Sequence, residues 1–200
     1  MKISHLNAFS DNYMWTMESD GKFAIVDPGD AKPVHQYIEE TGFELVEILV
    51  THHHWDHSGG IDELVTEYDC LAYGPSGGHI KGITNPLKDN ETFMIQNNIE
   101  VKAFSAPGHT DDQLSYFIDE AIDPILFSGD TLLINGTGRT DFQNGNAKDA
   151  YDSIFNKLLK LPEETLLYPA HDYKGEKVST IGKEKKQNPR LQVNSVDQYI

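Results

Sequence analysis

Residues 45–60 read LVEILVTHHHWDHSGG, an apolar strand pattern that runs directly into four histidines and an aspartate. Residues two apart in an extended segment point to the same side, so the pattern predicts that His52 and His54 face one side together. Asp56 and His57 stand where a helix should begin, and their side chains are expected to diverge toward a second position nearby. The intervening His53 and Trp55 are excluded as ligands. This spacing behind a buried strand indicates a metal site rather than a run of surface histidines.

Three later motifs carry the same kinds of side chain, each at a short apolar β-like stretch. Alone, each of them could be only a turn residue or a cap. Loops at sheet edges can converge on one ion, and imidazoles and carboxylates suit a first-row transition metal. The motifs are Pro107-Gly108-His109-Thr110, Ser128-Gly129-Asp130 and Pro169-Ala170-His171-Asp172-Tyr173. The candidate ligands are therefore His52, His54, Asp56, His57, His109, Asp130 and His171, whereas His5, His35 and His79 are interpreted as structural or surface residues.

Short β-like runs dominate the chain, and helical patterns interrupt them. The 200 residues suit one domain spanning 1–200. Two β-sheets packed face to face, with helices outside, would bury these one-sided elements and place the metal loops along one edge. Strands are predicted at Tyr13–Met17, Phe23–Val26, Leu45–Val50, Leu71–Tyr73, Phe93–Gln96, Glu100–Phe104, Leu114–Ile118, Ile125–Phe127 and Leu166–Tyr168. Helices are predicted at Pro33–Glu40, after the histidine cluster through Ile61, Leu64, Val65 and Tyr68, and at Ala147–Lys160 with Asn146 as N-cap.

The charge and composition of the chain exclude several classes of protein. A formal net charge of −16 opposes binding to nucleic acid. No apolar run approaches the ~20 residues that span a bilayer, and residues 1–6 lack a secretory signal, so no membrane association is expected. We expect a cytoplasmic location, or the mitochondrial matrix if a transit peptide has been removed. The single cysteine, Cys70, suits a reducing compartment and is predicted to be a packed thiol.

The motifs together resemble the metallo-β-lactamase superfamily: Thr-His-x-His-x-Asp-His at 51–57, then Pro-Gly-His-Thr, Gly-Asp and a late His. The resemblance covers nearly the whole chain. It implies an α/β (α+β) architecture, an αββα sandwich of two mixed β-sheets flanked by helices, with a metal centre at one edge. One departure stands out, because Asp111 and Asp112 follow Pro-Gly-His-Thr where relatives often have a glycine. These carboxylates could bias the choice of metal or only cap a strand turn.

Two branches of the superfamily compete. The first half is similar to glyoxalase II, a glutathione thioester hydrolase, in the segments 9–13 (FSDNY), 27–31 (DPGDA) and 73–75 (YGP). The second half is similar to the persulfide dioxygenases in the segments 131–134 (TLLI), 138–145 (GRTDFQNG), 168–173 (YPAHDY) and 188–190 (NPR). Glyoxalase II also carries an additional C-terminal helical domain, whereas this chain stops ten residues after Arg190.

The two arginines favour the dioxygenase branch. Among sixteen Lys and Arg residues only Arg139 and Arg190 are arginines, and both fall in the dioxygenase-like motifs. The planar fork of Arg binds carboxylates in a way that Lys cannot imitate, so the pair is predicted to anchor the two carboxylates of glutathione. Pairing with a local Asp is the alternative for each. Tyr173 is a candidate hydroxyl donor to substrate, or a wall residue.

The sequence thus predicts first a glutathione persulfide dioxygenase. By resemblance, His52, His109 and Asp130 hold one catalytic Fe(II) per chain, and His54, Asp56, His57 and His171 orient ligands and waters or form a second site. Its small-molecule partners would be O2 and a glutathione persulfide, which would yield sulfite and glutathione.

The alternative is a glyoxalase II-type hydroxyacylglutathione hydrolase. All seven ligands would then hold two Zn, or mixed Zn/Fe, with Asp130 bridging and activated water attacking the thioester. A non-catalytic module that senses or sequesters metal is a third option, against which the large ligand set and the arginines argue. The oligomeric state is open, with a homodimer as one option.

Overall fold

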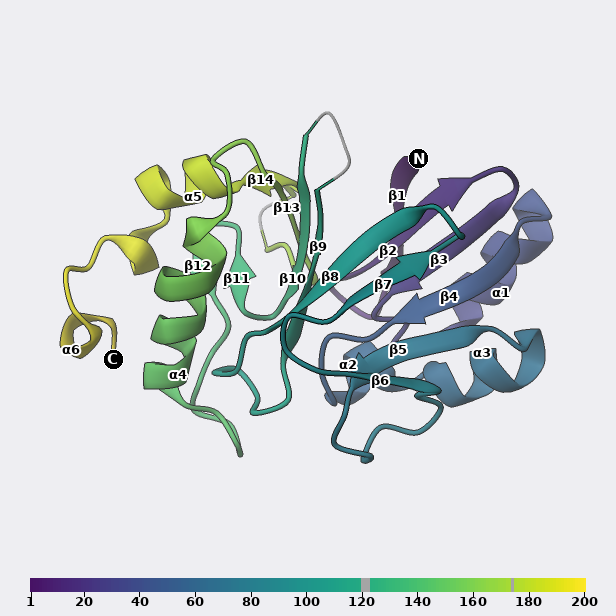
Figure 1. Ribbon diagram of the computed structural model, residues 1–200, viewed down its shortest axis with the longest axis horizontal. Coiled ribbons are helices and arrows are strands. Elements are labelled where there is room, and N and C mark those ends of the chain that lie inside the picture. The colour runs from purple at the N-terminus through teal and green to yellow at the C-terminus, as the bar shows by residue number, and fades with distance from the viewer. Residues whose placement is uncertain (120–122, 174) are drawn as a thin grey trace.

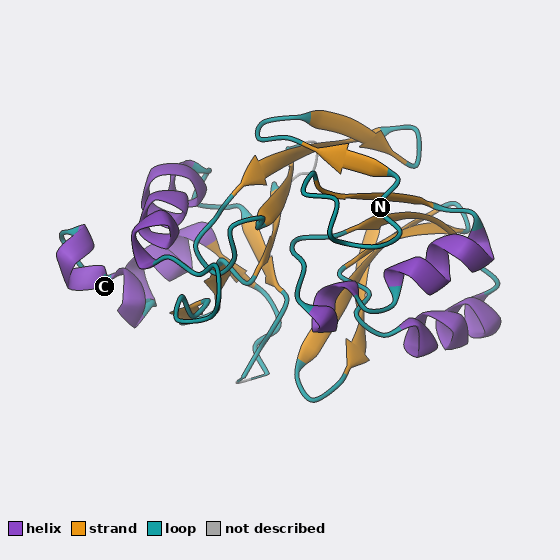
Figure 2. Ribbon diagram, turned by 90° about the horizontal axis from the view of Figure 1, so that it is seen from below, coloured by secondary structure: helices purple, strands orange, loops and turns teal. Residues whose placement is uncertain are grey.

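Two six-stranded β-sheets pack face to face and helices cover their outer faces (Figure 1). The computed structural model describes residues 1–119, 123–173 and 175–200. Viewed from below, the strands occupy the middle of the molecule and the helices lie on both outer sides (Figure 2). The predicted αββα sandwich is confirmed.

The first sheet is built from residues 2–87. Its first three strands are antiparallel, and the strands that follow are parallel to one another. Parallel neighbours need crossover connections, and two of these supply helices α1 and α3 on the outer face. The elements are β1 (Lys2–Ala8), β2 (Asn12–Ser19), β3 (Lys22–Val26), α1 (Ala31–Thr41), β4 (Glu44–Leu49), α2 (Trp55–Ser58), α3 (Ile61–Tyr68), β5 (Leu71–Pro75) and β6 (Asn85–Leu87).

The second sheet has the order β14-β13-β10-β9-β8-β7, with β10 and β13 parallel. A separate ribbon of β11 and β12 and the C-terminal helices lie beside it (Figure 1). The strands are β7 (Thr92–Ile95), β8 (Ile99–Ser105), β9 (Leu114–Ile118), β10 (Ile125–Gly129), β11 (Leu132–Leu133), β12 (Gly136–Thr137), β13 (Leu166–Pro169) and β14 (Ser179–Thr180). The helices are α4 (Ala147–Tyr151), η1 (Asp152–Lys157), η2 (Leu158–Lys160), α5 (Ile181–Gln187), η3 (Pro189–Leu191) and α6 (Val196–Tyr199).

Both faces of the central strands are buried, which explains the unbroken apolar run before the histidine cluster. Leu49 of β4 packs between the two sheets with Tyr116 and Phe127. Its neighbour Ile48 points the other way, into the layer between the first sheet and its helices. Because alternate residues of a strand face opposite sides, a strand covered on both sides reads as continuous apolar sequence. This double cover makes the strand ends rigid supports for the loops that follow.

Every predicted strand falls on an observed one, and the three predicted helices are present. Asn146 is the N-cap, since its side chain accepts hydrogen bonds from the N–H groups of Lys148 and Asp149. The prediction of one α-helix over Ala147–Lys160 needs correction: the α-helix ends at Tyr151, a π-helix covers Asp152–Lys157 and a 3-10 turn closes it. The apolar spacing correctly predicts a helical segment. It does not distinguish α-, π- and 3-10 helices, which differ in the carbonyl to which each N–H group donates.

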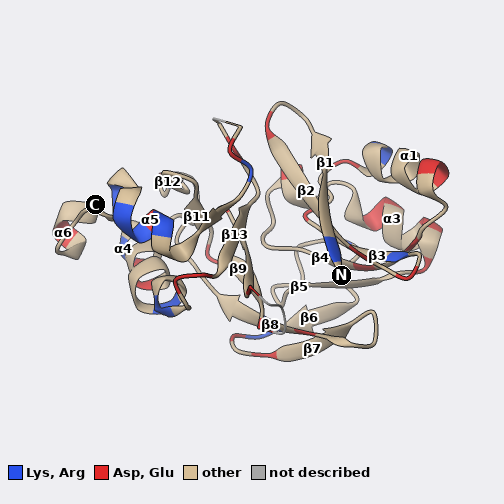
Figure 3. Ribbon diagram, turned by 90° about the horizontal axis from the view of Figure 1, so that it is seen from above, with Lys and Arg blue, Asp and Glu red and all other residues tan. Residues whose placement is uncertain are grey.

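Lys183, Lys185 and Lys186 lie on α5, and the other basic residues, like the acidic ones, are spread over the molecule (Figure 3). Lys183 pairs with Glu176, and Lys185 and Lys186 approach Glu163. These three lysines therefore form a solvated basic helix face. Within the described residues, none of the helices has the length and apolar character needed to cross a bilayer.

Candidate metal centre

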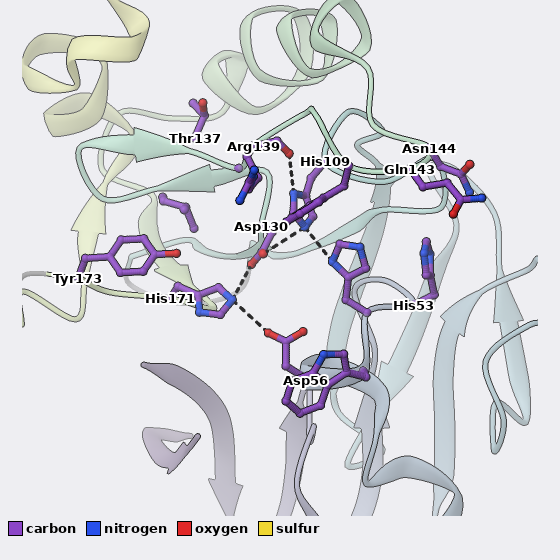
Figure 4. Close-up of a pocket in the computed structure, with 15 residues that line it drawn as sticks. His53, Asp56, His109, Asp130, Thr137, Arg139, Gln143, Asn144, His171 and Tyr173 are labelled. Carbon is purple, nitrogen blue, oxygen red and sulfur yellow. Dashed lines mark hydrogen bonds and ion pairs between the residues drawn. The ribbon is translucent and has the colours of Figure 1, made fainter. Parts of the chain in front are cut away.

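The seven candidate ligands converge at one edge of the sandwich, and Figure 4 labels four of them, Asp56, His109, Asp130 and His171. They come from segments that follow β4, β8 and β13, from the short helix α2, and from the end of β10. The strands hold these segments in place, so residues more than a hundred positions apart in sequence meet. The convergence that the sequence predicts is present.

A first group contains His52, His54 and His109, whose ligand atoms lie within 4.8 Å of one another. His54 Nδ1 is 3.0 Å from His109 Nε2. His109 Nδ1 lies 2.8 Å from the carbonyl oxygen of Arg139, which can only accept a hydrogen bond. Nδ1 therefore carries the hydrogen of the neutral ring, and Nε2 turns a lone pair into the group.

A second group contains Asp56, His57 and His171. His57 Nε2 is 3.3 Å from Asp56 Oδ2 and 3.3 Å from His171 Nε2, and His171 Nε2 is 3.6 Å from Asp56 Oδ2. Four ligands placed ~2.0–2.1 Å from one Zn²⁺ ion in a tetrahedron lie about 3.3–3.4 Å apart. The observed separations are close to the edges of such a coordination polyhedron.

Asp130 lies between the two groups. Its Oδ2 is 3.3 Å from His109 Nε2 of the first group, and its Oδ1 is 3.4 Å from His171 Nε2 and 3.7 Å from His57 Nε2 of the second. Oδ1 is buried and has no hydrogen bond from any of the described residues. One carboxylate thus presents one oxygen to each group.

The residues present fit a divalent metal. His52 Nε2 is buried and has no hydrogen-bond partner in the described part of the chain. Thr51 Oγ1 donates to Asp27, so the contact of His52 Nδ1 with Thr51 Oγ1 requires the ring to donate there and leaves Nε2 as a lone pair. Buried lone pairs without partners are costly unless a cation takes them. Nitrogen and carboxylate ligands together suit zinc or iron.

Acidic side chains outside the seven ligands set the orientation of two histidine rings. Asp27 Oδ2 lies 3.0 Å from His57 Nδ1, and Asp11 Oδ1 lies 3.2 Å from His171 Nδ1. Each contact favours a hydrogen on Nδ1 and leaves Nε2 for a metal. The sequence reasoning did not assign these two carboxylates. Their signal was present, because both stand in the segments 9–13 and 27–31 that carry the glyoxalase II resemblance.

The Pro-Gly-His-Thr motif owes its glycine to close packing. Gly108 has φ +145°, and a Cβ there would lie 2.3 Å from the Cα of Ala150 in α4. Any side chain at this position would collide with backbone, and only glycine adopts this conformation readily. The tight contact places His109 next to His52 and His54, the other two members of the first group.

Burial and charge prepare the ligands for a cation. Burial lowers the pKa of His52 well below its usual value and that of His54 to about 4, and neighbouring imidazoles lower both further. Burial alone would raise the pKa of Asp130, but His57 and His171 outweigh it and lower that pKa. At neutral pH His52 and His54 are therefore neutral imidazoles and Asp130 is an ionised carboxylate, the forms that bind metal.

A pocket of about 820 Å³ opens over the centre. Arg139 and Tyr173 both line it, and Figure 4 shows them on the same side of His109 and His171. The Arg139 guanidinium pairs with Asp141 through two contacts of 2.7 Å and stacks 4.1 Å from the Phe142 ring centre. The local Asp partner considered from the sequence is therefore present, and Arg139 still faces the pocket.

Arg190 lies outside this lining. Its Nη2 donates to the carbonyl oxygen of Tyr199 at 3.0 Å, and its guanidinium lies 4.9 Å from the centre of the Tyr199 ring. The Tyr199 hydroxyl in turn contacts Thr137, a pocket residue, at 3.1 Å. In this structure the Arg190 side chain contacts the pocket lining indirectly, through Tyr199 and Thr137, so its direct substrate role stays a prediction.

Comparison with known proteins gives one family. The model described as the metallo-beta-lactamase superfamily matches residues 9–171. The chain is 43% identical over 175 residues to the hydroxyacylglutathione hydrolase of Cronobacter sakazakii, covering 86% of this chain and 66% of that protein. It is 37% identical over 194 residues to the hydroxyacylglutathione hydrolase of Idiomarina loihiensis, covering 96% of this chain and 74% of that protein. The chain thus spans about two thirds to three quarters of the length of these two relatives.

Solved structures show the same fold. ETHE1 from Myxococcus xanthus superposes with a TM-score of 0.89 at 32% identity, covering 100% of this chain and 88% of that one. The BLEG-1 B3 metallo-beta-lactamase superposes with a TM-score of 0.84 at 25% identity, covering 96% of this chain and 100% of that one.

Proposed function

Since this chain belongs to the metallo-beta-lactamase superfamily, we propose that it is a metal-dependent hydrolase of glutathione thioesters of the hydroxyacylglutathione type. Water adds to the thioester carbonyl, the C–S bond breaks, and glutathione leaves as its thiol. This reverses the order in which the sequence favoured two functions. The hydrolase names of the curated relatives and the form of the metal centre support the change.

One observation carries the proposal: the two carboxylate oxygens of Asp130 face different ligand groups. A carboxylate so placed suits a pair of cations better than a single one. His52, His54 and His109 would hold one cation, Asp56, His57 and His171 the other, and Asp130 both. A pair of divalent cations supplies a water of lowered pKa and polarises the carbonyl oxygen.

The residues around the pocket would place the substrate. Arg139 presents its guanidinium to the pocket, where it can bind a glutathione carboxylate in competition with Asp141. Tyr173 stands next to His171 with its ring parallel and 6.1 Å away. Partial burial, with Asp130, Asp11 and Asp56 nearby, raises the pKa of Tyr173 and keeps its hydroxyl protonated. The phenol can therefore donate a hydrogen bond to the substrate at neutral pH.

A persulfide dioxygenase is the second candidate. It is favoured by the dioxygenase-like segments of the second half, because two of their residues, Arg139 and Tyr173, line the pocket. His52, His109 and Asp130 would then hold a single Fe(II), and the partners would be a glutathione persulfide and O2.

A thioesterase assay under strict exclusion of oxygen and an oxygen-uptake assay in air decide between the two. We expect the purified holoprotein to hydrolyse S-lactoylglutathione anaerobically and to contain two metal ions per chain. Oxygen uptake with glutathione persulfide, together with one iron per chain and no anaerobic thioester hydrolysis, would establish the second candidate instead.

A further inference from the structure

A further group of metal-binding side chains lies beside the centre described above but shares none of its residues. His53, His79 and Asp112 bring one ligand atom each to within 4.8 Å of the others. Asp112 Oδ1 is 2.8 Å from His53 Nδ1, and Asp112 Oδ2 is 2.9 Å from His79 Nε2. One carboxylate thus holds two imidazoles, one at each oxygen.

The three residues come from three separate segments and are increasingly exposed from one to the next. His53 follows β4, His79 lies between β5 and β6, and Asp112 lies between β8 and β9. The Asp112 side chain is 8% exposed, that of His53 28% and that of His79 44%. A buried anchor with a half-exposed outer ligand leaves room for water to complete the coordination of an ion.

We propose that His53, His79 and Asp112 form an additional binding site for a divalent transition-metal ion of the zinc type. Two imidazole nitrogens and a carboxylate are a ligand set that Zn²⁺ accepts, with water as the fourth ligand. The present contacts of 2.8 and 2.9 Å are shorter than the about 3.3 Å that separates ligands of one zinc ion. The half-exposed His79 ring can move outward by this amount.

The state of the His79 ring supports a cation at this position. The side chain of Asp112 and the backbone of Gly77 both raise the pKa of His79, which fits a ring that donates through Nδ1 to Gly77 and carries a positive partner at Nε2. The ring and Gly77 are tightly packed, since a Cβ on Gly77 would lie 2.4 Å from His79 Nδ1. A neutral ring that donates through Nδ1 turns a lone pair toward Asp112 through Nε2. A lone pair facing a carboxylate needs either a second proton or a metal ion between them.

The charge around the group also attracts cations. Asp89 and Asp111 line the same surface pocket as His79 and Asp112, together with Lys88, and Asp89 is already paired with Lys157 at 3.3 Å, so Asp111 adds the main further negative charge. These carboxylates lower the local potential and favour a divalent ion over a proton alone.

An ion here would act on the main centre through the backbone. His53 stands between the ligands His52 and His54, so fixing its ring restrains both of their main-chain positions. His53, excluded as a ligand of the main centre, gains a ligand role at a different one. Asp112 is one of the two aspartates that stand where relatives often have a glycine. It contacts both His53 and His79 and so connects the segments that carry them.

Metal binding by the holoprotein tests the proposal. Wild type and His79→Asn are dialysed against buffers of about 1 nM to about 100 µM free Zn²⁺, a range that brackets typical site affinities, and bound zinc per chain is measured. We expect His79→Asn to bind one zinc fewer than wild type, or to bind it at least about tenfold more weakly. Because the His79 side chain is exposed, its replacement should leave folding intact. Asp112→Asn is the second variant and is expected to lose the same zinc.

His35→Asn is the matched control, since His35 also contacts carboxylates, Glu63 and Glu67, but shares no residue with the main centre or with the His53, His79 and Asp112 group. It should bind as much zinc as wild type. Substitution with ¹¹³Cd²⁺ should give one NMR resonance that His79→Asn lacks and His35→Asn retains. Equal zinc binding by wild type and His79→Asn at every concentration would overturn the proposal and leave Asp112 paired with a protonated His79. The measurement compares ion numbers between variants, so it is independent of the catalytic activity and of how many ions the main centre holds.

Discussion

His57 Nδ1 lies 3.0 Å from Asp27 Oδ2, and both side chains are buried. Asp27 also accepts hydrogen bonds from the backbone N–H and the hydroxyl of Thr51, each at 2.7 Å. One carboxylate therefore orients His57 and, through Thr51, the ring of His52. Because His57 donates through Nδ1, its Nε2 atom points to Asp56, His171 and Asp130.

Asp27→Asn tests this orienting role. The amide keeps the size of the side chain but offers one acceptor oxygen instead of two, so either the contact at Oδ1 or the two contacts at Oδ2 are lost. We expect metal affinity to fall about 10- to 100-fold, as is usual when a carboxylate behind a metal-binding histidine is removed. Competition with a chelator measures it, with the exposed Asp197→Asn as control. Unchanged affinity would show that Asp27 only stabilises the loop.

Asp130→Asn should affect both ligand groups, whereas His54→Ala should affect one. In Asp130→Asn each former carboxylate contact loses its charge, and we expect metal content to drop below that of His54→Ala. Thioester turnover should fall about 10²-fold or more, because the charge of the centre is no longer balanced. Metal analysis of both purified variants gives the comparison. Equal metal contents would argue against a bridging role for Asp130.

Arg139→Lys should weaken substrate binding, whereas Arg190→Lys should lower the stability of the fold. Arg139 faces the pocket, so its replacement should raise KM for the thioester about tenfold with little change in kcat. Arg190 binds Tyr199, so its replacement should cost about 1 kcal/mol of folding free energy through the lost hydrogen bond and ring contact. Steady-state kinetics and thermal melting of both variants check this. A larger rise in KM for Arg190→Lys would restore Arg190 as the principal substrate anchor.

Glu47→Gln should stabilise the protein at neutral pH. Burial raises the pKa of Glu47 above its ordinary value of 4.5. A carboxyl with a raised folded-state pKa favours the fold below the unfolded-state pKa, and this advantage is lost as the pH rises through the folded-state value. Glutamine stays neutral, so the Tm gain of the variant over wild type should appear above pH 4.5 and vanish below it.

The neighbouring Glu44→Gln is the control for this pH series. Glu44 is exposed and only 3.5 Å from Lys22 across the surface, so its replacement should leave the Tm difference nearly flat with pH. Loss of metal in acid would affect wild type and variants alike. A Glu47→Gln gain that persists below pH 4.5 would mean that packing, not ionisation, causes it.

Local pattern in the sequence determined the strands, the position of the Asn146 cap and the seven converging ligands. These features rest on spacing along a few residues, such as the apolar run before Thr51 or the glycine before His109. The edge strand β1 escaped notice because its residues are mostly half-buried and show no clear alternation. Strand β6 has only three residues and includes a proline, so its pairing with β5 depends on the neighbouring strand.

Only the tertiary structure decided which side chains hydrogen-bond to the ligand histidines and which lie next to the metal centre. Asp27 reaches His57, Arg190 turns to Tyr199, and Asp112 joins His53 to His79. Each of these contacts links segments whose separation along the chain carries no local signal. A hydrogen bond or coordination bond forms within about 3 Å and depends on direction, so it is settled by how sheets and loops pack rather than by the order of residues.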